Sequence, residues 1–303
     1  MLRLIALATL SALAAGCGGG GSGAATRPSA PARPAVVIGA WDFTEEDILA
    51  QLYAQALEAK GFGVAIKRKI GTSELIDRVI RRGAIDMYPE YVGIVLSNIA
   101  RDARAPATPE ETYARALAFE RSRGLSLLAP TPFEDKDALA VKPAFAARHG
   151  LRSVADLRRV GAGLTVGAPP EFAGRRTGLI GMRSSYGITH VKFVPLLVPR
   201  QYAALDAGRV DVVDVSTTDA QLQRAGRYRL LSDPKRIFGF EHVAPVVRQA
   251  DLARLGPRFA STVDAVSRLL TTPLMRSMNV AVVTRGRDPA EVAREFLRRH
   301  DLL

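Results

Sequence analysis

The feature that most constrains the fold of this chain is a regular alternation of strand-like and helix-like segments. Residues 36–38 and 64–70 are typical of strands, and between them residues 44–60 carry apolar side chains at helical spacing. A second amphipathic helix is expected before a third short strand at residues 85–88. This alternation predicts mostly parallel sheets covered by helices on both faces.

The residues at two helix starts and the helices expected near the C-terminus add detail to this prediction. Thr44, which is followed by three acidic residues, and Thr72 are expected to cap their helices. The alternation resumes over residues 138–231. Further on, three helices without an intervening strand are expected over residues 252–270, 273–282 and 289–297. About 270 ordered residues exceed what one sheet organises, so we expect two α/β lobes.

The N-terminus has the pattern of a targeting segment. Residues 1–16 place one positive charge, Arg3, ahead of an apolar stretch too short to span a bilayer, which predicts a signal peptide. The residues before Cys17 resemble a bacterial lipobox, although Ala14 replaces the usual leucine. Residues 17–34 should then form a lipidated cysteine and a flexible linker rich in Gly, Ser, Pro and Ala. The alternative is plain secretion with an unpaired thiol.

Composition excludes several classes of function. The net charge of +12 comes from 42 basic and 30 acidic residues, but 35 of the basic residues are arginines scattered through the chain. No basic run is interleaved with aromatic residues, so nucleic acid is not expected as a partner. A single cysteine excludes an internal disulfide, and four widely separated histidines do not suggest a metal site. Neither a nucleophile elbow nor a dinucleotide-binding glycine motif occurs, so no catalytic residue or cofactor is expected.

Six segments together resemble the substrate-binding proteins of osmoprotectant ABC importers, of the glycine betaine, choline and carnitine type. The resemblance extends from about residue 36 to about residue 300, and its most specific element is Tyr-Pro-Glu-Tyr at residues 88–91. The segments that carry it are residues 38–45, 85–93, 132–141, 211–219, 231–234 and 244–248.

The resemblance implies a type II periplasmic-binding-protein fold with a ligand cleft between two α/β lobes. It places the first lobe at residues 35–136 and 242–303, and the second lobe at residues 137–241. A monomer outside the cytoplasm, held to a membrane only through a lipid on Cys17, would deliver its solute to an ABC permease.

The resemblance also implies a ligand pocket. Tyr91 falls on a tyrosine of the family's aromatic cage, and Arg175 falls on the arginine that holds the ligand carboxylate. Asp135 falls where the family has Asp or Asn, and Trp41 falls where it often has Lys or Gln. Three further cage positions, which are tyrosine in betaine binders, are occupied here by Asp137, Ser216 and Glu241.

Replacing cage tyrosines by acidic residues predicts a cationic solute that carries N–H donors, because buried carboxylates gain by pairing. If Arg175 also contacts the solute, the solute is zwitterionic. The alternative is that these acids lie at the rim, paired with arginines, and leave a weak betaine site built on Trp41, Tyr91 and Phe240. From the residues alone, Tyr91, Arg175 and Trp41 are equally compatible with packing or surface roles.

Two functions of different classes follow. The first is a substrate-binding lipoprotein that feeds an ABC importer. The second is a secreted enzyme or sensory module that reuses the two-lobe fold. An enzyme should bring a nucleophile, an activated base or a metal to the cleft, and the sequence offers none of these.

Overall fold

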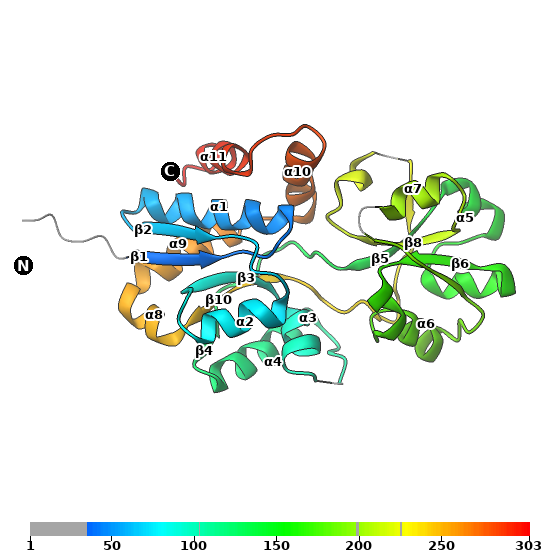
Figure 1. Ribbon diagram of the computed structural model, residues 1–303, viewed down its shortest axis with the longest axis horizontal. Coiled ribbons are helices and arrows are strands. Elements are labelled where there is room, and N and C mark those ends of the chain that lie inside the picture. Colours follow the sequence, from blue (N-terminus) through cyan, green and yellow to red (C-terminus); the bar gives the residue numbers. More distant parts are fainter. Residues whose placement is uncertain (1–34, 103, 198–199, 225) are drawn as a thin grey trace, which may run out of the picture. The chain divides into compact units, whose positions relative to one another are not determined.

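The computed structural model describes residues 35–102, 104–197, 200–224 and 226–303. The expected signal peptide, Cys17 and the linker lie outside these residues. The described chain forms two five-stranded sheets with helices packed against them, and Figure 1 shows both sheets. We call each sheet with its helices a lobe, the first lobe being the one that contains β1. Two α/β lobes agree with the expectation from the sequence.

The first sheet has the strand order β2-β1-β3-β10-β4. β1 pairs in parallel with β2 and β3, whereas β10 runs antiparallel to β3 and β4. Its strands are β1 (Ala35–Gly39), β2 (Gly63–Lys67), β3 (Met87–Tyr91), β4 (Leu125–Leu127) and β10 (Val243–Arg248). Because β10 comes from the last quarter of the chain, the chain must return from the second sheet to complete the first.

The second sheet has the order β7-β6-β8-β5-β9. β6 is parallel to β7 and β8, whereas β5 is antiparallel to β8 and β9. Its strands are β5 (Asp137–Val141), β6 (Thr165–Ala168), β7 (Lys192–Pro195), β8 (Val212–Ser216) and β9 (Arg229–Leu230). Residues 128–136 and 231–242 therefore connect the two sheets, and we call them the crossing segments.

The helices follow the strands as the alternation predicts. Those that accompany the first sheet are α1 (Thr44–Ala59), α2 (Ser73–Arg81), α3 (Val92–Ile94), α4 (Pro109–Ser122), α8 (Gln249–Leu255), α9 (Pro257–Ser267), α10 (Thr272–Val283) and α11 (Pro289–Arg299). Those that accompany the second sheet are α5 (Pro143–His149), α6 (Leu179–Tyr186) and α7 (Arg200–Asp206). Among the described helices, none is long and apolar enough to cross a membrane.

Each sheet has its own apolar core. In the first lobe α1 packs between the sheet and helices α9, α10 and α11, and it buries Leu49, Leu52 and Tyr53 completely. In the second lobe Leu139 and Val166 lie in a separate cluster. Burying one such side chain stabilises the fold by about 1.5–3 kcal/mol, so each lobe has its own source of stability.

The expectation of mostly parallel sheets is right for strand direction, because four strands of each sheet run the same way and one, β10 or β5, runs against them. Each sheet combines two parallel pairings with two antiparallel ones. The reason is that β5 and β10 each follow a crossing segment and enter their sheet against the direction of its other strands. The expected strand at residues 64–70 ends at Lys67, and the one expected at residues 85–88 is Met87–Tyr91.

Two expectations about helix starts and ends also need correction. Thr44 is the first residue of α1 and not its cap, and Thr72 occupies the N-cap position of α2 without a side-chain cap bond. The single helix expected over residues 252–270 is wrong. Gly256, at φ 75°, ends α8 in a backbone conformation that favours glycine, and Pro257 starts α9.

Candidate functional site

Three aromatic side chains gather at the carboxyl ends of β1 and β3. Trp41 and Phe43 lie in the connection from β1 to α1, and Tyr91 ends β3. The Trp41 ring meets the rings of Phe43 and Tyr91 edge-on, with centroids 5.9 Å apart in each pair. Phe43 and Tyr91 are stacked at 6.3 Å with an interplanar angle of 25°. We call these three rings the aromatic wall; Tyr91 is 2% exposed and Phe43 37% exposed.

The buried carboxyl group of Glu45 is hydrogen-bonded to Tyr91 of the wall. The Tyr91 hydroxyl donates to Glu45 Oε1 at 2.9 Å, and Asn279 Nδ2 donates to Glu45 Oε2 at 2.8 Å. Burial raises the pKa of Glu45, and hydrogen bonds from Thr218, Asn279 and Tyr91 lower it in part. The position of Tyr91 is therefore set by a carboxyl group that is only 2% exposed.

Asp135 lies in the first crossing segment. Its backbone N–H donates to the carbonyl oxygen of Glu241, 3.1 Å away in the other crossing segment, and its carboxylate accepts a short hydrogen bond from Ser216 Oγ. Burial and the charge of Glu45 raise the pKa of Asp135 well above its usual range, and a hydrogen bond from Thr218 partly offsets this. Asp135 therefore stands beside groups from both lobes.

Asp137 and Asp214 add acidic groups on the second sheet. Asp137 begins β5 directly opposite Ser216 of β8, so Asp137 and Asp214 are diagonal neighbours on that sheet. Burial raises the pKa of Asp137 to about 6, although the charge of Arg175 lowers it. Asp214 is 7% exposed, and its Oδ1 has no hydrogen-bond partner among the described residues. Burial and then the charge of Asp137 raise the pKa of Asp214 well above its usual range.

Arg175 directly follows the short helix η4 (Pro170–Gly174), with a side chain 49% exposed and Nη2 4.0 Å from Glu171 Oε1. Its charge lowers the pKa of Asp137 in its own lobe. In the first lobe, a hydrogen bond from Thr72 lowers the pKa of Glu74, and the charge of Arg175 lowers it further. The guanidinium is thus close to both lobes and exposed enough to receive an anion.

Glu241 is already engaged by the backbone. Its Oε2 accepts from the N–H of Ile94 at 3.1 Å, and its carboxylate also accepts from the N–H of Gly93. Burial raises its pKa well above the usual range, and these two hydrogen bonds partly offset that effect. At the start of α3 the carboxylate therefore meets backbone donors that are otherwise unpaired at a helix start.

The chain matches one family model over residues 34–299, described as the substrate-binding domain of ABC-type glycine betaine transport systems. It is 34% identical over 280 residues to a glycine-betaine-binding protein of Pseudomonas aeruginosa, and the match covers 88% of each chain. This chain belongs to that family.

Other members agree in sequence and fold. The glycine betaine-binding protein YehZ of Escherichia coli is 27% identical over 276 residues, which cover 87% of this chain and 90% of YehZ. The apo structure of YehZ matches with a TM-score of 0.70 at 25% identity, covering 89% of this chain and 99% of that one. A crystal structure of a glycine betaine/carnitine/choline ABC transporter, at 22% identity, has a TM-score of 0.79 and covers 88% and 99%.

Family membership fixes the class of function. As a member of the glycine betaine transport family, the chain is a substrate-binding component of an ABC importer, which binds a small solute and delivers it to a permease. The family consists of transport proteins and not of enzymes. The likeness to solved structures confirms the expected two-lobe periplasmic-binding-protein fold.

The contacts divide the predicted contact residues of this family member into two sets, one around Tyr91 and one around Asp135 and Ser216. Trp41 meets Tyr91, Asp135 bonds Ser216, and Asp137 lies opposite Ser216. Arg175 is close enough to Asp137 to shift its pKa, and Glu241 is joined to Asp135 through the backbone. Whether each residue contacts a solute remains a prediction.

Sequence reasoning missed four residues of this region. Phe43 and Glu45 belong to the segment at residues 38–45, but their roles depend on how the β1–α1 connection places them against Tyr91. Asp214 belongs to the segment at residues 211–219, but no local pattern shows that β8 pairs with β5 and so brings Asp214 near Asp137. Asn279 lies in a helix far along the chain, and no sequence signal connects it with Glu45.

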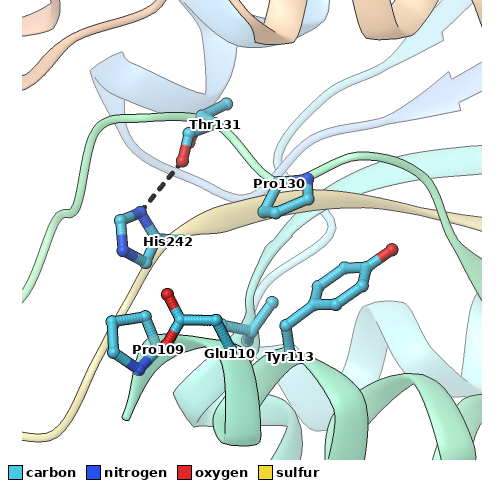
Figure 2. Close-up of a pocket in the computed structure, with 7 residues that line it drawn as sticks. Pro109, Glu110, Tyr113, Pro130, Thr131 and His242 are labelled. Atoms are coloured by element: carbon cyan, nitrogen blue, oxygen red, sulfur yellow. Dashed lines mark hydrogen bonds between the residues drawn. The ribbon is translucent and has the colours of Figure 1, made fainter.

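Two hollows lie near the predicted contact residues. One of them, in the first lobe, has a volume of about 300 Å³. Figure 2 shows residues that line it, among them His242 and Thr131. His242 Nδ1 lies 2.9 Å from the carbonyl oxygen of Thr131. A carbonyl only accepts, so Nδ1 carries the proton. None of the predicted contact residues lines this hollow. The other hollow, of about 250 Å³, is lined in part by Asp137 and Phe240.

Proposed function

We propose that the solute is a small cation or zwitterion, held between the aromatic wall and the acidic group of Asp135, Asp137 and Asp214. The wall offers π faces from the first lobe, and the carboxylates offer negative charge and hydrogen-bond acceptors from the first crossing segment and the second sheet. Such a site would bind a cation with aromatic rings on one side of it and carboxylates on the other.

The clustering of these carboxyl groups carries the proposal: Asp137 and Asp214 are diagonal neighbours on the second sheet, and Ser216, opposite Asp137, donates to Asp135. Burial and neighbouring carboxylates both raise the pKa of Asp135 and that of Asp214. Carboxylates placed together with little water around them are costly unless a cation is bound among them. A positively charged solute would remove this cost and draw part of its affinity from doing so.

The acidic group favours a cation with N–H donors over a trimethylammonium compound. Amine or guanidinium hydrogens can donate to Asp135 and Asp137, whereas a methylated nitrogen has nothing to donate. Glu241 contributes less than the sequence suggested, because Ile94 and Gly93 already donate to its carboxylate. A carboxylate on the same solute would pair with Arg175.

The second candidate is glycine betaine itself, which the relatives from Pseudomonas aeruginosa and Escherichia coli are named for. The aromatic wall supports it. Phe240 supports it less, because its ring already faces Lys136 Nζ at 6.0 Å and Arg236 Cζ at 5.8 Å. Two cations near the ring disfavour a third.

A competition experiment tests the proposal. The protein is screened by thermal shift and then calorimetry against glycine betaine, choline, carnitine, basic amino acids and polyamines. A true ligand at 100 times its Kd adds about 2.7 kcal/mol of stability, which raises the midpoint by roughly 5–10 °C. We expect an N–H cation to bind more tightly than glycine betaine, and to lose affinity in Asp137→Asn. Glycine betaine binding more tightly than every N–H cation would establish the second candidate instead.

We further propose that Cys17 is the lipidated N-terminus of the mature protein and that residues 18–34 tether the body to a membrane. Location outside the cytoplasm follows the family, and the small residues before Cys17 support the anchor. We also propose that the protein acts as a monomer, with lobe boundaries at residues 136/137 and 241/242. These boundaries are supported by the strand order of the two sheets.

A further inference from the structure

Helix α10 belongs to the first lobe but makes hydrogen bonds to the second. It contacts α1 and α11, which lie beside it in Figure 1, and it also contacts η5 (Ala220–Gln223), which follows β8. Arg276 donates from Nε at 3.2 Å and from Nη2 at 2.5 Å to the carbonyl oxygen of Thr217. One turn later, Asn279 Nδ2 donates to the carbonyl oxygen of Thr218 at 3.1 Å. Two side chains of one helix thus hold two successive carbonyls of the other lobe.

Asn279 has a second acceptor in its own lobe. The same Nδ2 donates to Glu45 Oε2, whose partner oxygen Oε1 accepts from the Tyr91 hydroxyl. Both neighbours of the amide nitrogen are acceptors, so the side chain cannot be turned over without placing Oδ1 against two oxygens. Asn279 is 7% exposed, and its two N–H groups are divided between the two lobes.

We propose that Arg276 and Asn279 form an inter-lobe clasp that holds the segment after β8 against α10, and that Asn279 positions Tyr91 through Glu45. They are positioning residues, because their donors are used on backbone and carboxylate oxygens and not on a solute. The link to solute affinity rests on the proposed function, whereas the clasp itself does not.

Through the clasp, the distance between the lobes should affect the arrangement of the rings in the aromatic wall. If the lobes move apart, Asn279 loses Thr218 and has only Glu45 left to bond. Glu45 would then be freer to move, and with it the Tyr91 ring that stacks on Phe43. The wall should therefore be well ordered only while the second lobe is in place.

A distance measurement tests the clasp without any solute. Spin labels are placed at Glu58→Cys in α1 and Ser184→Cys in α6 of the full chain carrying Cys17→Ser. Arg276→Ala and Asn279→Ala are each expected to shift the inter-label distances to longer and broader distributions. Ser277→Ala, an exposed change on the same helix, should leave them unchanged, and Arg276→Lys should recover part of the effect. Distributions identical to wild type in both alanine variants would overturn the clasp.

The connection to Tyr91 is read by Trp41, the single tryptophan of the chain, whose ring centroid is 5.9 Å from that of Tyr91. Asn279→Ala should increase quenching of Trp41 fluorescence by acrylamide more than Arg276→Ala, because only Asn279 reaches Glu45. Equal quenching in the two variants would refute the connection. Circular dichroism confirms that each variant is folded, and if Asn279→Ala does not fold, the distance measurement on Arg276→Ala still tests the clasp. Neither the inter-label distance nor the quenching of Trp41 needs a bound solute. Both measurements therefore test the clasp even if the proposed solute class is wrong.

Discussion

The carboxylate of Glu241 occupies the space that a side chain at Gly93 would need. A Cβ atom built on Gly93 would lie 2.5 Å from Glu241 Cδ, closer than real Cβ contacts allow. The backbone of Gly93 does not adopt a positive φ, so glycine is required here for close approach and not for conformational freedom. This contact joins the second crossing segment to the start of α3, directly after the aromatic wall.

Gly93→Ala should therefore destabilise the protein. The new methyl group would push the Glu241 carboxylate off the N–H groups of Gly93 and Ile94. We expect the free energy of unfolding to fall by about 1–3 kcal/mol, as for other overpacked sites. Urea denaturation measures the change. Gly163→Ala, where no atom lies within 4 Å of the added Cβ, serves as the control and should remain within about 0.5 kcal/mol of wild type. Equal effects of the two substitutions would contradict the steric argument.

Much of the fold was predictable because its signals are local. The apolar periodicity of residues 44–60 located α1 to within a residue at its C-terminal end, and the alternation of elements predicted two α/β lobes. The antiparallel strands β5 and β10 were not predictable in this way. Their direction depends on the chain crossing between sheets, which no local pattern records.

For the candidate site, too, local motifs were predictive and long-range contacts were not. Tyr91 and Trp41 were identified through motifs, and the structure brings their rings together. The engagement of Glu241 by Gly93 and Ile94 could not be foreseen, because it depends on residues about 150 positions apart in sequence being joined by tertiary structure. The same holds for Asn279 and Glu45.

Cys17→Ala should release the protein from membranes. Without the thiol no lipid can be attached, and the remaining N-terminal stretch is too short to span a bilayer. Fractionation of cells that produce either form tests this, with the variant expected in the soluble extracytoplasmic fraction. Cys17→Ser is the control. Serine is polar and of similar size but has no thiol, so this variant should also leave the membrane fraction. Wild-type protein found already in the soluble fraction would contradict the anchor.

Binding of a cation should strengthen as the pH rises through about 6. Burial raises the pKa of Asp137 to about 6, so below this pH the free protein holds Asp137 protonated and offers less negative charge. The sign for stability is opposite. Because the folded pKa lies above the ordinary value of 3.8, protonation favours the folded state, and the stability this group contributes at low pH is lost as the pH rises from about 4 to 6.

Calorimetric titration at pH 5, 6 and 7 with a permanently charged probe, choline, separates these effects from titration of the solute. We expect the affinity of wild type to rise across this range and that of Asp137→Asn to change less. A wild-type profile as flat as that of the variant would show that Asp137 does not face the cation.

Arg175 and Tyr91 should affect different parts of the solute from opposite lobes. Arg175→Ala removes a charged hydrogen-bond donor and is expected to weaken a zwitterion by about 1.5–3 kcal/mol, while sparing choline, which has no carboxylate. Tyr91→Ala removes a cation–π face and should weaken both by about 0.5–2 kcal/mol. Arg183→Ala, another exposed arginine in the second lobe, is the matched control, and thermal melts establish that all three variants fold. Calorimetry with carnitine and choline decides the assignment. An equal loss for both compounds in Arg175→Ala would mean that Arg175 does not hold the carboxylate, because only a contact with that group can distinguish the two solutes.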